Sequence, residues 1–228
     1  MTALRFKSWI RKWVVSPTRQ RRPSLALMAA LAPMFASALW LDTVRPTAAQ
    51  TPAHVSLAGQ FLVAAPSMVD PRFDRTVILM VAHDQNGAFG IVVNRLIGER
   101  PIATLLQRLG ENDTSGITGN VRVFSGGPVQ PGVGFVIHSA DYHRAQTLDI
   151  DGRLGVTSSR EILHDIGSDK GPKQSLIAFG YAGWGPGQLE DEIKNRVWVT
   201  APVELRLIFD EDRDKLWEAA FALRTQDL

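Results

Sequence analysis

The amino-acid sequence predicts an α+β fold, built as one globular domain (residues 51–228) behind a basic leader (residues 1–50). Apolar, strand-like runs dominate the first half of the domain, whereas the second half mixes strands with short amphipathic helices. Strands and helices do not alternate regularly, which argues against a doubly wound parallel sheet. With 228 residues, 45% of them hydrophobic and 21% charged, the chain has the composition of a globular protein with a packed core.

The first part of the domain is predicted to be rich in buried strands. Two continuous apolar runs are bounded by prolines and turn residues, which is typical of strands covered on both faces. A third run returns after a short turn, so a hairpin is expected there. An amphipathic segment that ends at Gly110 predicts a short helix. The predicted segments are strands at 61–65, 76–82 and 90–94 and a helix at 102–109.

Helices join the strands in the second part. Ser158 to Glu161 has the spacing of a capping box, in which serine and glutamate side chains satisfy free backbone N–H groups at a helix start. Pro186 suits the first position of a later helix, after a glycine-rich turn. The predicted segments are strands at 121–124, 134–138, 174–180 and 196–200 and helices at 159–166, 188–195 and 214–224.

The charges are distributed unevenly along the chain. The leader has a net charge of +7, which leaves −5 for residues 51–228, so the sequence pI of 9.1 reflects the leader. Nucleic-acid affinity comes mainly from Lys and Arg that neutralise phosphates, so direct nucleic-acid binding by the acidic domain is not expected. The absence of cysteine excludes disulfides, thiolate metal ligands and a cysteine nucleophile.

The leader has the layout of an export signal. Seven Arg or Lys residues within positions 1–22 precede an apolar run at 25–41, and small residues follow at 47–49. We therefore expect export to the periplasm with cleavage after Ala49, or a tether to the inner membrane. The run is short for a spanning helix and contains Pro33. Membrane contact is expected through residues 24–41 only; a cytoplasmic protein with a wrongly assigned start is the alternative.

Four segments of the domain together resemble one protein family. They are Ala64–Phe73, Phe124–Gly132, His138–Tyr142 and Gly180–Glu190. Over residues 56–223 the chain is similar to the YqgE/AlgH family, whose bacterial members are sometimes called transcriptional regulators but have no established biochemical activity. The resemblance implies a strongly bent mixed β-sheet that forms a pseudo-barrel, flanked by short helices. It does not imply a reaction or a cofactor.

Two histidines stand at the ends of predicted strands, where side chains can leave the core and line a cleft. If His83 and His138 met, one of them could act as a general base, oriented by Asp84 or Asp141. Ser139 or Ser125 would then be the nucleophile. No Gly-x-Ser-x-Gly elbow accompanies them. The alternative is that both histidines bond to backbone groups and hold loops.

A metal site is a further alternative. His138, Asp141 and His143 carry ligand types that suit zinc or manganese, but their spacing matches no known ligand motif. We therefore expect neither a metal nor another cofactor.

Two glycine-rich loops are the better candidates for a ligand-facing surface. Free backbone N–H groups there could form an anion-binding nest, although acidic residues in the following helix would repel a phosphate. Close packing of strands and helix is the competing interpretation. The candidate ligand-binding residues are Asn94, Gly126, Gly127, Tyr181, Gly183, Trp184 and Gly187. The sequence thus favours a protein that binds a small ligand or a partner and has a regulatory role, with a small-molecule hydrolase as the alternative.

Overall fold

The structure is a computed structural model that describes residues 55–209 and 212–225. The chain divides into two compact units between Ala53 and His54, and the fold below is that of the second unit. The predicted leader, the apolar run at 24–41 and the cleavage site after Ala49 lie outside the described residues. None of the described helices is both long and apolar enough to span a membrane.

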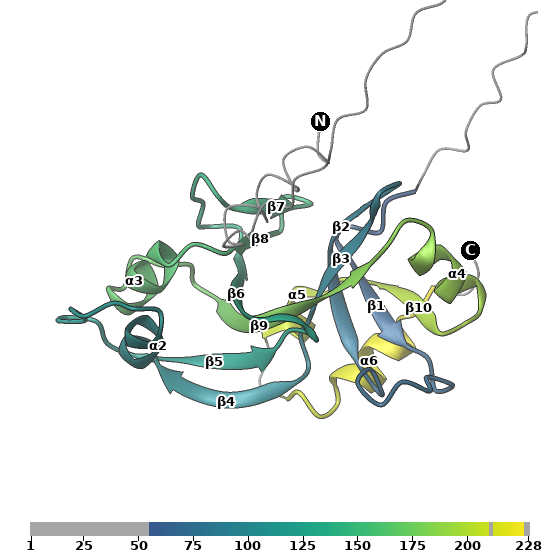
Figure 1. Ribbon diagram of the computed structural model, residues 1–228, viewed down its shortest axis with the longest axis horizontal. Helices are drawn as coiled ribbons and strands as arrows, with labels where there is room; N and C mark the ends of the chain where they lie inside the picture. Colours follow the sequence, from purple (N-terminus) through teal and green to yellow (C-terminus); the bar gives the residue numbers. More distant parts are fainter. Residues whose placement is uncertain (1–54, 210–211, 226–228) are drawn as a thin grey trace, which may run out of the picture. The chain divides into compact units, whose positions relative to one another are not determined.

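One strongly curled sheet forms the body of this unit (Figure 1). Its strands are β1 (Gln60–Ala64), β2 (Val77–Asp84), β3 (Gly87–Val92), β4 (Leu96–Pro101), β5 (Asn120–Ser125), β6 (Val129–Ser139), β7 (Leu148–Ile150), β8 (Leu154–Thr157), β9 (Ser175–Trp184) and β10 (Trp198–Pro202). The main order is β10-β1-β2-β3-β9-β6-β8-β7, while β5 pairs with β9 and β4 with β5. The neighbours are antiparallel except β5 and β9, so the sheet is mixed.

Strand β9 is the central strand of the sheet. Its first half pairs with β6 on one side and with β5 on the other. Its last three residues pair with β3 instead. The two ends of β9 therefore belong to different parts of the curled sheet, which decides where the candidate site residues lie.

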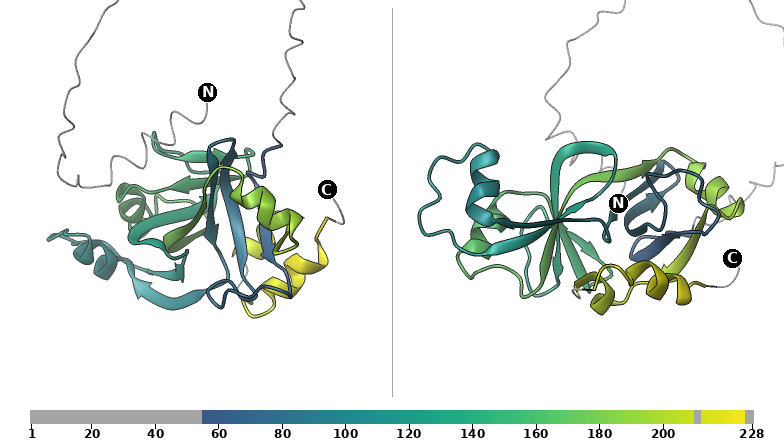
Figure 2. Two further views of the ribbon diagram at one scale, coloured as in Figure 1. Left: turned by 45° about the vertical axis from the view of Figure 1, so that its right-hand side comes forward. Right: turned by 90° about the horizontal axis from the view of Figure 1, so that it is seen from below.

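Short helices cover the sheet at separate places. They are α2 (Ile102–Arg108), α3 (Glu161–Gly167), α4 (Gln188–Lys194), α5 (Leu205–Phe209) and α6 (Leu216–Ala222). Helices α2 and α3 pack against each other, and α6 packs against β1, β2 and β10 (Figure 2). The Trp217 indole N–H donates to the Ala64 carbonyl oxygen at 2.9 Å, which fixes α6 to β1.

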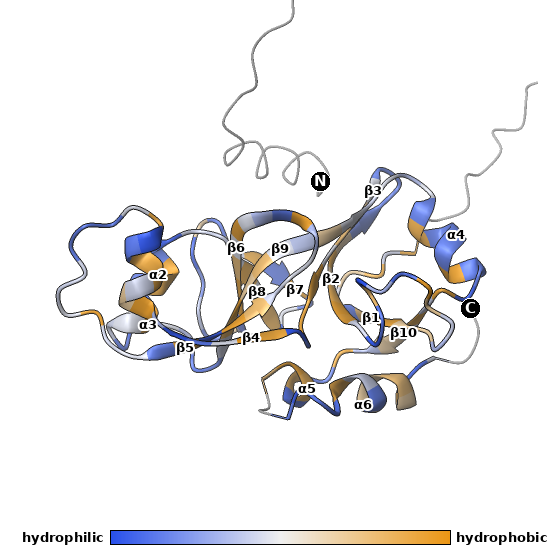
Figure 3. Ribbon diagram, turned by 60° about the horizontal axis from the view of Figure 1, so that its bottom comes forward, coloured by the Kyte–Doolittle hydropathy of each residue, from blue (hydrophilic) through white to orange (hydrophobic). Residues whose placement is uncertain are grey.

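Two clusters of buried side chains form much of the core. One surrounds Trp184 and Trp198 beneath α4, and the other lies between α2, α3 and strands β5, β6 and β9. Strands β2, β6 and β9 carry long hydrophobic stretches, whereas α4 is largely hydrophilic (Figure 3). Strand β1 is buried at four of its five positions and β2 at six of eight, as the continuous apolar runs predict.

The structure confirms the predicted fold class: a strongly curled half-barrel sheet with short helices. The four-residue turn at Asp84–Gly87 joins β2 to β3 in the expected hairpin. The sequence did not reveal β4, β7, β8 or α5. Strand β4 could not be predicted because its largely exposed sequence, Leu-Ile-Gly-Glu-Arg-Pro, has neither a long apolar run nor a regular alternation of apolar and polar residues.

Three local predictions are wrong. Helix α3 begins at Glu161 with Arg160 at its N-cap and no side-chain cap bond, so the capping box does not form. Pro186 lies outside α4, because Gly187 with φ +75° is the N-cap. The glycines up to Gly183 belong to β9 and not to a turn, which is confined to residues 185–187.

Candidate functional site

The first glycine pair lies where two backbones cross. A Cβ at Gly127 would lie 2.2 Å from the Tyr181 carbonyl carbon, and one at Gly126 would lie 2.3 Å from the Gly180 oxygen. The Gly126 N–H donates to the Phe179 oxygen at 2.7 Å, and its own oxygen accepts from the Val92 N–H at 2.9 Å. The glycines permit this close approach, and the backbone groups of Gly126 are already bonded to the sheet.

The second glycine-rich stretch fastens α4 to the sheet. The Glu192 carboxylate accepts the indole N–H groups of Trp184 and Trp198, each at 2.8 Å. Gln188 links this carboxylate to the turn, because it donates to Glu192 at 2.8 Å and accepts the Gly185 N–H at 3.1 Å. Trp184 is only 8% exposed and packs in the core. Gly183 lies in β9 beside the Tyr181 ring.

Tyr181 is the candidate whose ring is partly exposed. It packs against Phe89 with ring centroids 4.8 Å apart and against Phe135 with centroids 6.2 Å apart. Burial raises the pKa of its phenol above the usual range. The ring therefore extends an aromatic cluster that lies across β3, β6 and β9.

His83 is bonded on both ring nitrogens. Its Nδ1 accepts the Leu57 N–H at 3.2 Å, which leaves the proton on Nε2, and Nε2 donates to Glu190 Oε1 at 3.0 Å. Asp84 does not orient this ring, because its Oδ1 accepts the Asn86 N–H at 2.7 Å in the hairpin turn. The contact joins α4 to β2.

His138 is fully buried and bonded within the fold. Its Nδ1–H donates to the Ser139 carbonyl oxygen at 2.9 Å, and its Nε2 accepts from the Thr157 hydroxyl at 3.0 Å. Thr157 in turn accepts from the Thr147 hydroxyl at 2.7 Å. Desolvation by burial lowers the pKa of His138, and the bond to Ser139 opposes that shift. The ring is therefore held neutral.

Ser139 and Asp141 form a separate contact. The Ser139 hydroxyl donates to Asp141 Oδ1, and Ser139 Oγ accepts the Gln174 N–H at 3.2 Å. The hydrogen bond from the Ser139 hydroxyl lowers the pKa of the exposed Asp141 carboxyl. Ser139 is thus linked to the start of β9, and its partner is a carboxylate and not the His138 ring.

The structure does not bring the two histidines together. In the sheet, His83 of β2 lies opposite Ala88 of β3, and Ala88 lies opposite Trp184 at the end of β9. His138 of β6 lies opposite Ser175, at the beginning of β9. The ten residues of β9 span roughly 30 Å when extended. The two imidazoles therefore lie in different parts of the sheet, each with its own hydrogen-bond partners.

No metal-binding cluster forms within residues 55–209 and 212–225, the part of the chain that the structure describes. His138 uses both ring nitrogens inside the fold, as described above. His143 is exposed in the loop after β6 and is not gathered with Asp141 around a common point.

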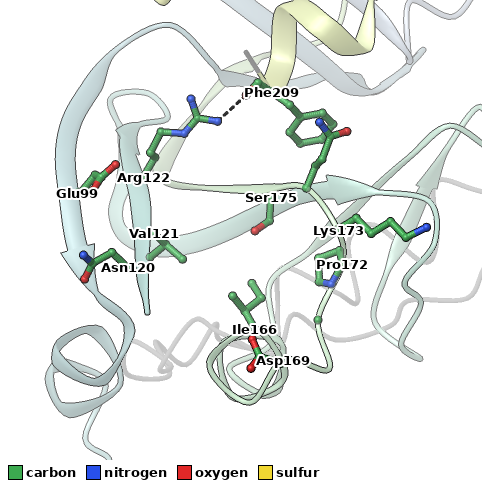
Figure 4. Close-up of a pocket in the computed structure, with 12 residues that line it drawn as sticks. Glu99, Asn120, Val121, Arg122, Ile166, Asp169, Pro172, Lys173, Ser175 and Phe209 are labelled. Atoms are coloured by element: carbon green, nitrogen blue, oxygen red, sulfur yellow. Dashed lines mark hydrogen bonds between the residues drawn. The ribbon is translucent and has the colours of Figure 1, made fainter. Parts of the chain in front are cut away.

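A pocket that the sequence did not reveal opens between β5 and the segment 171–175 that leads into β9 (Figure 4). Its volume is about 620 Å³, and residues at the ends of α3 and α5 contribute to its lining. None of the candidate residues predicted from the sequence lines it. The Gly171-Pro172 pair marks a loop in the sequence, but only the fold places that loop opposite Asn120.

Asn94 lies at a second, smaller pocket of about 500 Å³, next to Arg95 and residues 212–214. Its side-chain oxygen accepts the Val77 N–H at 2.9 Å, and its amide nitrogen donates to the Arg75 oxygen at 2.8 Å. Asn94 therefore ties the end of β3 to the start of β2. It lies at the opposite end of β2 from His83.

The structure is that of an α+β protein with a curled sheet, a backbone crossing at Gly127 and a helix α4 attached through Glu192. Comparison with known proteins gives its family. The family model described as AlgH-like matches residues 61–228. The chain belongs to this AlgH-like family.

Relatives and solved structures agree with this assignment. A UPF0301 protein of Methylococcus capsulatus is 42% identical over 167 residues, covering 73% of this chain and 91% of the relative. One from Rhodospirillum rubrum is 44% identical over 154 residues, covering 68% and 80%. The solution structure of AlgH from Pseudomonas aeruginosa is 36% identical with a TM-score of 0.65, covering 74% of this chain and 89% of that one.

A more distant crystal structure shares the fold alone. It is a protein of Corynebacterium diphtheriae, 22% identical with a TM-score of 0.55, covering 71% of this chain and 83% of that chain. The names of these relatives assign no reaction to the family.

Proposed function

We propose that this chain acts by binding a ligand or a partner protein, with a regulatory role, and not by hydrolysis through its histidines and serine. The observation that carries the proposal is the bonding of His138, Ser139 and Asp141. His138 is bonded to Thr157 and to a backbone oxygen, and Ser139 donates to Asp141. An activated serine needs an effective base within hydrogen-bond reach of its hydroxyl. His138 is bonded elsewhere, and the Asp141 carboxylate that accepts from Ser139 is a weak base because that hydrogen bond lowers its pKa further.

The pocket beside β5 supports binding as the function. It has a volume of about 620 Å³, is open to solvent and is lined mainly by polar groups, so it suits a ligand or a partner that binds at the surface. The net charge of −5 over residues 51–228 favours a small ligand or a protein over a nucleic acid. We also propose that the leader exports or tethers the protein, so that the ligand or partner belongs to the cell envelope.

A covalent probe separates binding from hydrolysis. The full chain is incubated with a fluorophosphonate, which labels activated serines, and the modified residues are located by mass spectrometry. We expect no adduct on Ser139 and the same labelling pattern for Ser139→Ala. Stoichiometric labelling of Ser139 that disappears in His138→Gln would instead support the hydrolase hypothesis.

A further inference from the structure

The pocket beside β5 lies where two neighbouring strands diverge. Strands β5 and β9 pair in parallel only from Val123 with Ile177 to Ser125 with Phe179. Before these pairs, residues 120–122 and 171–175 line opposite walls of the pocket. The pocket is therefore a gap in the sheet, open at the upstream ends of both strands.

The backbone groups that face this gap follow from the direction of nearby bonds. The Ser125 N–H donates to the Arg95 oxygen on the β4 side, and the next N–H, of Gly126, donates to the Phe179 oxygen on the β9 side. Backbone groups of successive residues in a strand point to opposite neighbours. Those of Arg122 and Asn120 therefore point toward β9, into the gap.

Backbone groups of the opposite wall, residues 171–175, also point into the gap. The Gln174 oxygen accepts the Ser139 N–H on the β6 side, so the backbone groups of Ser175 point toward β5. The gap thus has main-chain groups that point into it from both walls.

The side chains around the gap suit a peptide better than a charged small molecule. Buried Val121 and Phe209 contribute apolar surface, and Ser175 adds a hydroxyl. Charges of both signs are present, because Glu99 and Asp169 accompany Arg122 and Lys173. The Arg122 guanidinium donates to the Phe209 oxygen at 2.6 Å, which holds α5 beside the gap (Figure 4). A phosphate or an anionic membrane would meet no net positive charge here.

We propose that this gap binds an extended peptide segment of a partner protein, which adds a strand between β5 and the start of β9. Main-chain hydrogen bonds to an exposed sheet edge are a common mode of peptide recognition. The mixed charges of Glu99, Asp169 and Lys173 fit a segment that itself carries both signs. This inference rests on the proposed binding function and names its ligand.

The test begins with a library of random 12-residue peptides displayed on phage, selected against the full chain. An enriched peptide is synthesised, and its affinity is measured by fluorescence anisotropy. Asn120→Pro removes the N–H that points into the gap, and Asn120→Ala keeps it as the matched control. We expect Asn120→Pro to weaken binding about tenfold, as for the loss of one hydrogen bond, and Asn120→Ala to change it less than about twofold.

Two further readouts do not depend on Asn120→Pro folding well. Ser175→Phe fills the gap and is expected to abolish binding. N-methylation of the peptide, one amide at a time, is expected to weaken binding at alternate positions, because alternate amides of a paired strand bond to the same neighbour.

Three results would overturn the proposal: no enriched peptide, affinities unchanged by Ser175→Phe, or an N-methyl scan without alternation. A peptide that binds independently of Ser175 would leave the proposed binding function in place and move its site elsewhere. Failure of the binding function itself would appear separately, as labelling of Ser139 by the fluorophosphonate.

Discussion

The Glu192 carboxylate attaches α4 to the core, in addition to the contact of Glu190 with His83. Glu192 accepts hydrogen bonds from the indoles of Trp184 and Trp198, and both rings lie in the core beneath the helix. In the sequence, the acidic residues of this helix argue against phosphate binding. One of them has a structural role that residue type and spacing alone do not reveal.

Replacement of this carboxylate should destabilise the fold. Glu192→Ala leaves two indole N–H groups without their acceptor, so we expect the free energy of unfolding in urea to fall by about 2–4 kcal/mol. Asp191→Ala, one residue away on the exposed side of α4, should cost less than about 1 kcal/mol. Equal losses in the two variants would contradict this assignment.

The buried histidine predicts a dependence of stability on pH. Burial lowers the pKa of His138, so between its folded and unfolded pKa values the unfolded chain binds more protons. Its contribution to stability is complete above about pH 6.5 and is lost as the pH falls through that value toward the folded pKa. We expect the fall in unfolding free energy between pH 7.5 and 5.5 to be smaller in His138→Gln than in the parent chain. An equal fall in both proteins would show that His138 is not held neutral by the fold.

At the scale of elements, the crossing of Gly127 over β9 depends on the absence of a side chain. Gly127→Ala would place a Cβ 2.2 Å from the Tyr181 carbonyl carbon, at φ +147°. We expect a loss of about 2–4 kcal/mol in unfolding free energy by urea titration. Gly132→Ala is the matched control, because nothing lies within 4 Å of its Cβ, and it should change stability by less than about 1 kcal/mol. A tolerated Gly127→Ala would contradict the close crossing.

Elements with strong apolar patterns could be predicted from the sequence, and those without them could not. The apolar runs that form β1 and β2 are buried along most of their length. Buried positions require apolar residues, so these strands are recognisable from the sequence. The glycines of β9 suggested a turn because glycine is a turn residue, whereas Gly180 is needed for close packing against Gly127. Local sequence does not distinguish these two uses of glycine.

At the scale of the whole molecule, the candidate site depends on strand register, which the sequence does not contain. His83 and His138 both lie near the ends of apolar strands, as predicted, but the register places them at opposite ends of β9. The pocket beside β5 arises because β5 and β9 lie apart upstream of their three paired residues. No local motif encodes that divergence.

The leader carries a prediction of its own. If it is an export signal, the protein isolated from its native host begins near Gln50, because small residues at 47–49 precede that position. Intact-mass measurement of the purified protein checks this. An uncleaved chain in the membrane fraction would support a tether, and one in the cytosol would contradict export.

The most direct test of the binding account is photo-crosslinking in the native host. A photoreactive amino acid replaces Lys173 at the edge of the pocket or, as the control, Lys194 on α4; both positions are exposed. We predict a discrete adduct with a partner at position 173 that is absent at 194 and is lost when Ser175→Phe fills the pocket. Equal adducts at both positions, or none at 173, would contradict the account.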